Sequence, residues 1–441
     1  MKKGDVEINR ISVCGYKSIN QEQSIAIRPL TILAGANNSG KSSIMQPLLL
    51  LKQTLEIPYD PGPLLLHGPN IKLTAADQIF SKTTTKKCKN SFYLKILVSD
   101  TSEITLSFRR KTGVGLDLDA MHVTDTKRNR TIFLTADAQH EELMKQLPEE
   151  VRNIHKMLTK HEKSPLRCTV VRTRCFFHLN LVGEKARTTF EIGSPPPSDQ
   201  LKKSLQAFIH VPGLRGNPER VYPTTSVGPS FPGVINDYIA SIIANWQQND
   251  QPKIKLLGTT LEHLGLTWKV RTKPIGDTHV EIHVGRLPHC VRGGARDLVS
   301  VADVGFGVSQ VLPVIVALLV ATRKQMVYIE QPEIHLHPRA QSQLALILAA
   351  AVKRGVNVIV ETHSKLLLRG IQTLVAEGYL TPDDVQLHWF RRKSVDGSTE
   401  IYSGNLDIDG SFGDWPEDFD EVTLGAEEAY LDAVTNTGGP K

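Results

Sequence analysis

Hydrophobic residues follow two different patterns along the chain. Residues 6–19 and 24–35 contain apolar runs of strand length, and residues 42–55 place apolar residues at helical spacing. After about residue 297 apolar strands alternate with helices, which predicts a parallel sheet covered by helices on both faces. The strands predicted there are residues 326–332 and 356–364, and the helices are residues 307–324, 339–355 and 365–378.

The middle of the chain has a different pattern. Short strand-like runs, such as residues 92–100 and 166–183, surround a polar helical stretch at residues 138–163. We therefore predict an α/β domain that is split by a long β-rich and helical insertion, which is basic. The predicted limits are 1–60 for the N-terminal lobe, 61–297 for the insertion, 298–405 for the C-terminal lobe and 406–441 for an acidic tail.

The composition is typical of a globular protein of two or three domains. The chain has 441 residues, of which 40% are hydrophobic and 22% are charged. Its longest apolar run, residues 311–321, is too short to span a bilayer, and its first residues lack the apolar segment of a signal peptide. The five scattered cysteines predict reduced thiols. These features predict a cytoplasmic protein with no membrane partner.

Charge is distributed unevenly. The net charge is +6, yet residues 405–440 contain ten acids and no lysine or arginine. Four basic clusters lie between Lys82 and Cys175, at residues 85–90, 108–113, 125–130 and 170–175. They fit either a nucleic-acid backbone, such as that of DNA, or an acidic partner, or else a solvated face of exposed strands.

The turn between the strand at 24–35 and the helix at 42–55 matches a phosphate-binding loop, G-x-x-x-x-G-K-[ST]. In such a loop, glycines let backbone N–H groups approach phosphate, and the next helix directs its positive end at the same anion. Lys41 can reach the β- and γ-phosphates, and the Ser42 hydroxyl can hold Mg²⁺. The motif predicts bound ATP and Mg²⁺ at Gly35, Asn37, Asn38, Ser39, Gly40, Lys41 and Ser42.

Three later segments predict the rest of this site. The strand at 326–332 contains Glu330, an acid that we expect beside the phosphate loop as a Mg²⁺-organising group. Taken alone, an acid after an apolar strand is common and need not have this role. The strand at 356–364 ends at His363, which either contacts a γ-phosphate or the attacking water, or is simply hydrogen-bonded. Ser364 is expected to cap the next helix. Residues 303–313 form a glycine-containing loop that is either a second anion site or a packing loop.

Taken together, the motifs GANNSGKSS, VGFGVSQVLP, IEQPEIHLHP and VIVETHS resemble the ATP-binding-cassette class of ATPase in its SMC and RecF branch. Within that branch, the chain looks most like predicted ATPases that are related to the ATPase half of OLD-family proteins. These predicted ATPases lack a TOPRIM domain. The resemblance covers roughly residues 1–80 and 205–405. It implies an ABC-ATPase head, in which two chains pack head-to-tail and trap two ATP molecules.

The resemblance also assigns roles to residues. Each ATP would contact the phosphate loop of one chain, including Ser43, and the signature loop of the other. The residues DVGFGVSQ place Gly305, Gly307, Ser309 and Gln310 in that signature loop. His335 and His337 take the D-loop place, which we prefer to a two-histidine metal site, and His363 is the switch residue. Gln78, or Asp77, is expected to contact Mg²⁺ and the water near it.

Two positions depart from the family pattern. Gln331 stands where the catalytic glutamate is usual, and it can orient water but cannot take a proton. Glu333 is the candidate substitute, and otherwise turnover is expected to be slow. Gly305 stands where a serine is usual, so Ser309 or backbone N–H groups would contact the γ-phosphate.

Two functions follow from the resemblance. The first is an ATP-gated subunit that forms homodimers or larger assemblies and controls a separate effector. Similarity to Septu-type ATPases points to a nuclease effector in prokaryotic anti-phage defence. The second is a RecF-like clamp that acts on DNA without a partner. A self-contained nuclease is not expected, because the residues after His363 leave no room for a TOPRIM domain.

Overall fold

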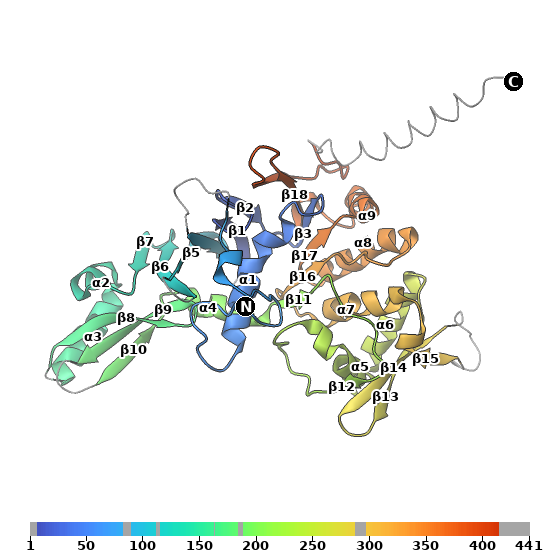
Figure 1. The fold of residues 1–441 in the computed structure, drawn as a ribbon, viewed down its shortest axis with the longest axis horizontal. Helices are drawn as coiled ribbons and strands as arrows, with labels where there is room; N and C mark the ends of the chain where they lie inside the picture. Colours follow the sequence, from blue (N-terminus) through green and yellow to red (C-terminus); the bar gives the residue numbers. More distant parts are fainter. Residues whose placement is uncertain are drawn as a thin grey trace, which may run out of the picture.

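Strands from both ends of the chain form one central sheet (Figure 1). The computed structural model describes residues 7–82, 90–111, 115–162, 164–183, 188–286 and 297–413. The order of this sheet is β11-β16-β17-β3-β18-β19, with β19 antiparallel to β18 and the other neighbours parallel. The bounds are Leu30–Gly35 (β3), Ile209–Val211 (β11), Met326–Glu330 (β16), Asn357–Thr362 (β17), Val385–Arg392 (β18) and Thr399–Gly404 (β19).

Successive residues of the central strands contribute to two different hydrophobic cores. Ile32 belongs to one core and Leu33, the next residue of β3, belongs to the other. Side chains of a strand alternate between the faces of its sheet, so both faces are covered. The first core contains residues of α7 (Phe306–Val320), α8 (Pro338–Lys353) and α9 (Lys365–Ala376), and the second contains those of α1 (Lys41–Glu56). The predicted α/β class is confirmed.

A second, antiparallel sheet shares a core with α1. Its order is β2-β1-β4-β5-β6-β7, so strands from the start of the chain pair with strands of the predicted insertion. Its bounds are Ile8–Cys14 (β1), Gln23–Ala26 (β2), Ser91–Val98 (β4), Ser102–Arg110 (β5), Leu116–Asp125 (β6) and Arg130–Leu134 (β7).

Two smaller sheets complete the described structure, and they lie on opposite sides of the central sheet in Figure 1. The first lies with α2 (His140–Gln146), α3 (Glu149–Glu162) and α4 (Ser198–Ala207), and consists of β8 (Leu166–Thr173), β9 (Phe176–Gly183) and β10 (Thr189–Gly193). The second lies with α5 (Ile239–Asn249) and α6 (Gln251–His263), and consists of β12 (Tyr222–Pro223), β13 (Val270–Ile275), β14 (His279–Gly285) and β15 (Leu298–Ser300). The short 3₁₀ helices are η1 (Ala76–Gln78), η3 (Ser99–Thr101), η4 (Ile235–Tyr238), η5 (Val301–Asp303) and η6 (Pro382–Asp384).

The predicted limits 60/61 and 297/298 cut across these sheets. β11 comes from the insertion but pairs with β16 of the central sheet, and β4 of the insertion pairs with β1. Insertion residues therefore reach the carboxyl edge of the central sheet, where the nucleotide motifs lie. Most of the basic cluster at 85–90 and the tail from residue 414 lie outside the described residues.

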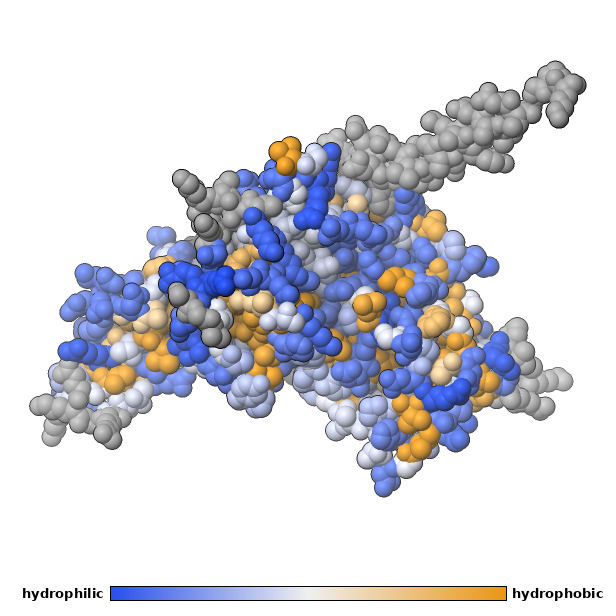
Figure 2. Space-filling model, viewed as in Figure 1, coloured by the Kyte–Doolittle hydropathy of each residue, from blue (hydrophilic) through white to orange (hydrophobic). Residues whose placement is uncertain are grey.

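Hydrophilic residues dominate the surface in view in Figure 2, and hydrophobic residues appear there in small patches. Among the helices that the structure describes, none has the length and apolar character needed to cross a bilayer. Cys14, Cys168 and Cys175 are buried and form no disulfide bond. Ser364 caps α9 as predicted, because its hydroxyl accepts a hydrogen bond from the Leu367 N–H.

Candidate functional site

The loop between β3 and α1 has the backbone of a phosphate cradle. Gly35, Asn38 and Gly40 have φ angles of 143°, 63° and 100°, in a region that glycine adopts readily and that is unfavourable for most other residues. A Cβ atom on Gly35 would collide with the Phe390 carbonyl of β18, and one on Gly40 would collide with the Thr399 hydroxyl. Both glycines are therefore required by the packing of the loop against β18 and β19.

Lys41 lies inside this loop. Its ammonium donates hydrogen bonds to the carbonyl oxygens of Gly35 (3.1 Å) and Ala36 (2.8 Å). The residue is only 3% exposed. Burial lowers the pKa of Lys41, and the charges of Glu361 and Glu333 oppose that shift. The ammonium is thus held by the backbone of the loop, with two carboxylates nearby.

Ser42 is paired with Glu361 of β17. The hydroxyl of Ser42 donates to the two carboxylate oxygens of Glu361 at 2.9 and 3.1 Å. The Tyr328 hydroxyl donates to the same carboxylate at 2.9 Å. Burial and the charge of Glu330 raise the pKa of Glu361. Sequence reasoning missed Glu361, although its place two residues before the predicted switch histidine was a usable signal.

Glu330 lies one strand farther from the loop than expected. β17 separates β16 from β3, and Glu330 is the in-register partner of Glu361. Glu330 is therefore separated from β3, the strand that leads into the phosphate loop, by a strand that comes later in the chain. Its Mg²⁺ role stays a prediction.

The carboxylate of Glu330 faces the β11 side of the sheet. It is hydrogen-bonded to His210 Nε2 (3.1 Å) and accepts a hydrogen bond from the Gly213 N–H (3.0 Å). Burial raises the pKa of Glu330, but the His210 hydrogen bond and charge, the Gly213 N–H and Arg215 outweigh it and leave the pKa lowered. The ionised form of the Glu330 carboxylate is therefore favoured in the folded protein.

The turn after β16 contacts the segment that carries the predicted switch histidine, His363. Gln331 has a φ of 45°, and its N–H donates to the Glu361 carbonyl at 2.7 Å. Glu333 accepts hydrogen bonds from the Thr362 hydroxyl (2.8 Å) and from the His363 N–H (2.7 Å). The second carboxylate oxygen of Glu333 is buried and has no hydrogen-bond partner among the described residues.

His363 closes the connection back to the phosphate loop. Its imidazole lies close to the Gly35 backbone, and burial followed by the charge of Lys41 lowers its pKa. A neutral imidazole at neutral pH can accept or donate a hydrogen bond. The structure therefore brings Lys41, Ser42, Glu361, Glu333 and His363 to one edge of the central sheet.

The predicted signature loop contacts the predicted D-loop. Gly305 caps the start of α7, and a Cβ atom there would meet no atom within 4 Å. The rings of Phe306 and His335 lie 5.7 Å apart, and a Cβ on Gly307 would lie 3.4 Å from the His335 carbonyl oxygen. Phe306 is half exposed. The start of α7 thus presents an open face.

Other predicted residues have mainly local partners. The Ser309 hydroxyl donates to the Phe306 carbonyl (3.0 Å), and the His337 side chain caps α8 by accepting from the Arg339 N–H. Gln78 bonds to the backbone and hydroxyl of Thr74 (2.9 and 3.0 Å). Asp77 pairs with Arg110 at 2.5 Å. Gln310 reaches the Gly216 carbonyl at 2.8 Å.

The oxygen atoms of the side chains at this edge of the sheet fit a hydrated divalent cation. Mg²⁺ prefers oxygen ligands, and Ser42, Glu361 and Glu330 supply a hydroxyl and two carboxylates at one sheet edge. Burial and the charge of Glu330 raise the pKa of Glu361, and a bound cation would favour its ionised form against both effects. Among the described residues, no group of three or more histidine, cysteine or acidic side chains is arranged to hold a metal ion by itself.

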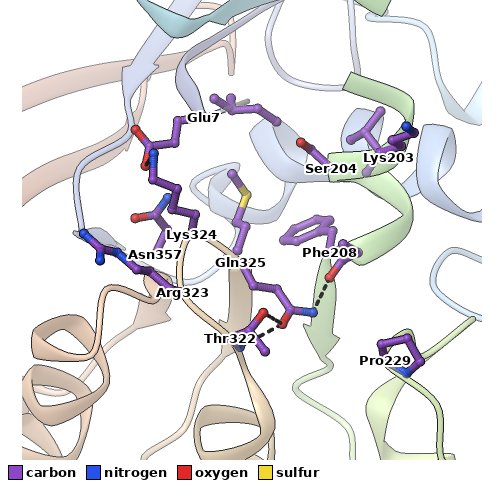
Figure 3. Close-up of a pocket in the computed structure, with 14 residues that line it drawn as sticks. Glu7, Lys203, Ser204, Phe208, Pro229, Thr322, Arg323, Lys324, Gln325 and Asn357 are labelled. Atoms are coloured by element: carbon purple, nitrogen blue, oxygen red, sulfur yellow. Dashed lines mark hydrogen bonds and ion pairs between the residues drawn. The ribbon is translucent and has the colours of Figure 1, made fainter. Parts of the chain in front are cut away.

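A cavity of about 260 Å³ lies at the opposite edge of the central sheet (Figure 3). It is lined by residues at the start of β16 and β17, among them Met326 and Asn357. Gln325 forms part of its wall and donates to the Ala207 carbonyl at 2.7 Å. Because phosphate loops follow the carboxyl ends of strands, this cavity is separate from the nucleotide motifs.

A protein-family model described as "AAA domain, putative AbiEii toxin, Type IV TA system" matches residues 30–369. The chain belongs to this family. The matched span of this AAA-domain family contains the phosphate loop, the signature loop, β16 and β17. The predicted resemblance to ATPases is confirmed at the level of this AAA-domain family, whereas closeness to OLD-family or Septu-type ATPases stays a prediction.

Solved structures similar to this AAA-domain chain are heads of SMC proteins. An SMC head bound to the C-terminal winged-helix domain of ScpA is 13% identical, with a TM-score of 0.45, and the match covers 91% of this chain and 98% of that one. An SMC head from Thermotoga maritima is 11% identical (TM-score 0.36, 90% and 98% covered). One from Pyrococcus furiosus, bound to the C-terminal domain of ScpA, is 11% identical (0.41, 91% and 96%). No curated protein matches the sequence. With TM-scores under 0.5, family membership rests on the sequence match.

Proposed function

We propose that this chain is an ATP-binding and hydrolysing switch subunit that dimerises head-to-tail around ATP. Its effector would be a separate protein, a nuclease in prokaryotic anti-phage defence, and it would act in the cytoplasm. The observation that carries the ATP site is the meeting of Lys41, Ser42, Glu361 and His363 around one loop.

The open start of α7 supports dimerisation. Gly305 has no atom near its Cβ position, and Phe306 is half exposed, so this loop has a free face. The phosphate loop has different neighbours, namely β18, β19 and His363. A second chain would then supply the signature loop to each ATP, and ATP would act as the link between subunits.

A mixing experiment tests the head-to-tail arrangement. Lys41→Ala removes the phosphate-binding cation, and Gly305→Arg adds a long side chain where the fold has room for it. Each variant alone should fail to hydrolyse ATP or to form the ATP-dependent dimer seen by light scattering. An equal mixture should regain hydrolysis, because a mixed dimer contains one intact site. Lack of recovery, with both variants folded, would contradict the head-to-tail arrangement.

The alternative is a RecF-like clamp that binds DNA by itself. Several of the basic residues that suggested DNA are paired with acids. Arg109 lies 2.8 Å from Asp119, Arg110 is paired with Asp77, and Arg172 lies 2.9 Å from Asp60. Paired cations have less charge to offer to phosphates. ATP-dependent binding of DNA by the purified chain would favour the clamp, and co-purification of an effector from the native host would favour the switch.

A further inference from the structure

An arginine of the insertion reaches the nucleotide site. Arg215 lies in the loop between β11 and β12, and its Nη2 atom donates to the carbonyl oxygens of Glu330 (2.5 Å) and Gln331 (3.1 Å). Burial lowers the pKa of Arg215 to about 10, against the charges of Glu333 and Glu330. The guanidinium therefore stays charged at neutral pH, although it is largely buried.

The backbone of Gln331 is held from two sides. Its N–H donates to the Glu361 carbonyl (2.7 Å), and its carbonyl accepts from Arg215. Gln331 also has a φ of 45°, a conformation that costs roughly 1–3 kcal/mol for a residue other than glycine. Such a conformation persists only where the surroundings hold it, and Arg215 supplies one of the contacts that do so, beside the Glu361 carbonyl and the Ile334 N–H, which donates to the Gln331 carbonyl at 3.3 Å.

The same loop is tied to the signature helix. The Gly216 carbonyl accepts a hydrogen bond from Gln310 of α7 at 2.8 Å. Arg220 forms two hydrogen bonds with Asp303, just before the signature glycines, at 2.7 and 3.0 Å. The loop 212–221 thus joins the residue that would orient water to the element that would contact the partner's ATP.

Arg215 also has hydrogen-bond donors that no described residue accepts. Its Nε and Nη1 atoms are buried and have no hydrogen-bond partner in the described part of the chain. Unpaired buried donors are rare in folded proteins, because each costs about 1–3 kcal/mol. They occur where a site is completed by something else, and here they lie in a charge cluster with Glu333 and Glu330.

We propose that Arg215 is a positioning residue for ATP hydrolysis, which holds Gln331 in its water-orienting conformation and links it to the signature helix. This inference rests on the proposed ATPase function. Arg215 acts through Gln331, so its loss should lower kcat and leave ATP affinity in place.

The test compares Arg215→Gln with Arg215→Lys and with a matched control, Arg354→Gln. Arg354 also donates to backbone carbonyls, those of Leu318 (2.7 Å) and Ala350 (3.3 Å), but at the other end of α7. Arg215→Gln should reduce kcat about tenfold or more, with the Kd for ATP within about twofold of wild type. Arg215→Lys keeps the charge but not the planar fork, so it should recover part of the rate. Arg354→Gln should hydrolyse ATP at the wild-type rate.

A second readout does not depend on hydrolysis. In the nucleotide-free protein, hydrogen exchange of the amides of residues 331–336 should speed up in Arg215→Gln and not in Arg354→Gln. Unchanged exchange together with a kcat within twofold of wild type would overturn the proposal, as would a parallel loss of ATP affinity. If Arg215→Gln does not fold, Arg215→Lys decides by the same criteria. Failure of ATP to bind the wild type would instead contradict the proposed function, and the exchange result would still decide the positioning role.

Discussion

The Ser42 hydroxyl lies 2.9 Å from a carboxylate oxygen of Glu361, a residue 319 positions later in the chain. Ser42 is the second residue of α1, the helix after the phosphate loop, and Glu361 lies near the carboxyl end of the adjacent strand β17. This contact joins the two halves of the site. The carboxylate of Glu361 is therefore in direct contact with Ser42, the serine that is expected to hold Mg²⁺.

Glu361→Gln is expected to stabilise the nucleotide-free protein at neutral pH. Burial and the charge of Glu330 raise the pKa of Glu361, so the folded state disfavours its ionised form. Stability is then lost as the pH rises from the ordinary range of a glutamate through the raised pKa. The melting temperature of the variant should exceed that of wild type at pH 7, and the difference should shrink toward pH 4. A lower melting temperature at pH 7 would contradict this assignment.

Glu330→Gln should have the opposite effect. The pKa of Glu330 is lowered, since the contacts with His210, Gly213 and Arg215 outweigh burial. The ionised carboxylate therefore contributes stability at neutral pH, and that contribution is lost as the pH falls through the lowered pKa. We expect the variant to lose about 1–3 kcal/mol of unfolding free energy at pH 7. Denaturant titrations at pH 7 and pH 4 measure this, and an equal loss at both values would argue against the ionised carboxylate as the cause.

Gly35→Ala should be poorly tolerated. The residue has a φ of 143°, and a Cβ atom would collide with the Phe390 carbonyl. We expect a loss of more than about 2 kcal/mol, together with weaker ATP binding, measured by chemical denaturation and nucleotide titration. Gly62→Ala is the control, because Gly62 has a φ of 103° but no atom within 4 Å of its Cβ position. Its cost should be about 1 kcal/mol, from the backbone alone. Equal costs would exclude the collision as the main effect.

His363→Gln should lower hydrolysis about tenfold and flatten its dependence on pH. Burial and the charge of Lys41 lower the pKa of His363, so the imidazole is neutral at pH 7. In the wild type the rate should fall at acidic pH, below the ordinary histidine range, as the imidazole gains a proton. Rates measured between pH 5 and pH 8 test this. An acid limb that persists unchanged in the variant would assign the titration to another group.

Gln331→Glu should raise the rate of hydrolysis by about tenfold or more, because a carboxylate can take the proton of the attacking water and an amide cannot. Single-turnover kinetics with saturating ATP measure the change. Glu333→Gln is the companion variant, since Glu333 has a buried carboxylate oxygen without a partner among the described residues. If Gln331→Glu has no effect and Glu333→Gln abolishes hydrolysis, then Glu333 is the base.

Local features of the sequence determined the phosphate loop, the elements around it and the α/β class. The positions of Gly35, Gly40, Lys41 and Ser42 follow from short-range rules, because a strand, a glycine turn and a helix start are neighbours in the chain. The alternation after residue 297 also sufficed to predict the strands β16 and β17. For these features the pattern of a few adjacent residues is enough.

Only the tertiary structure decided which distant residues join that loop. Whether Glu330 or Glu361 reaches Ser42 depends on the order of strands in the sheet, and β17 rather than β16 lies beside β3. Arg215 reaches Gln331 because β11, from within the predicted insertion, pairs with β16. Strand order and edge pairing arise from packing between segments far apart in the chain, so neither spacing nor periodicity encodes them locally.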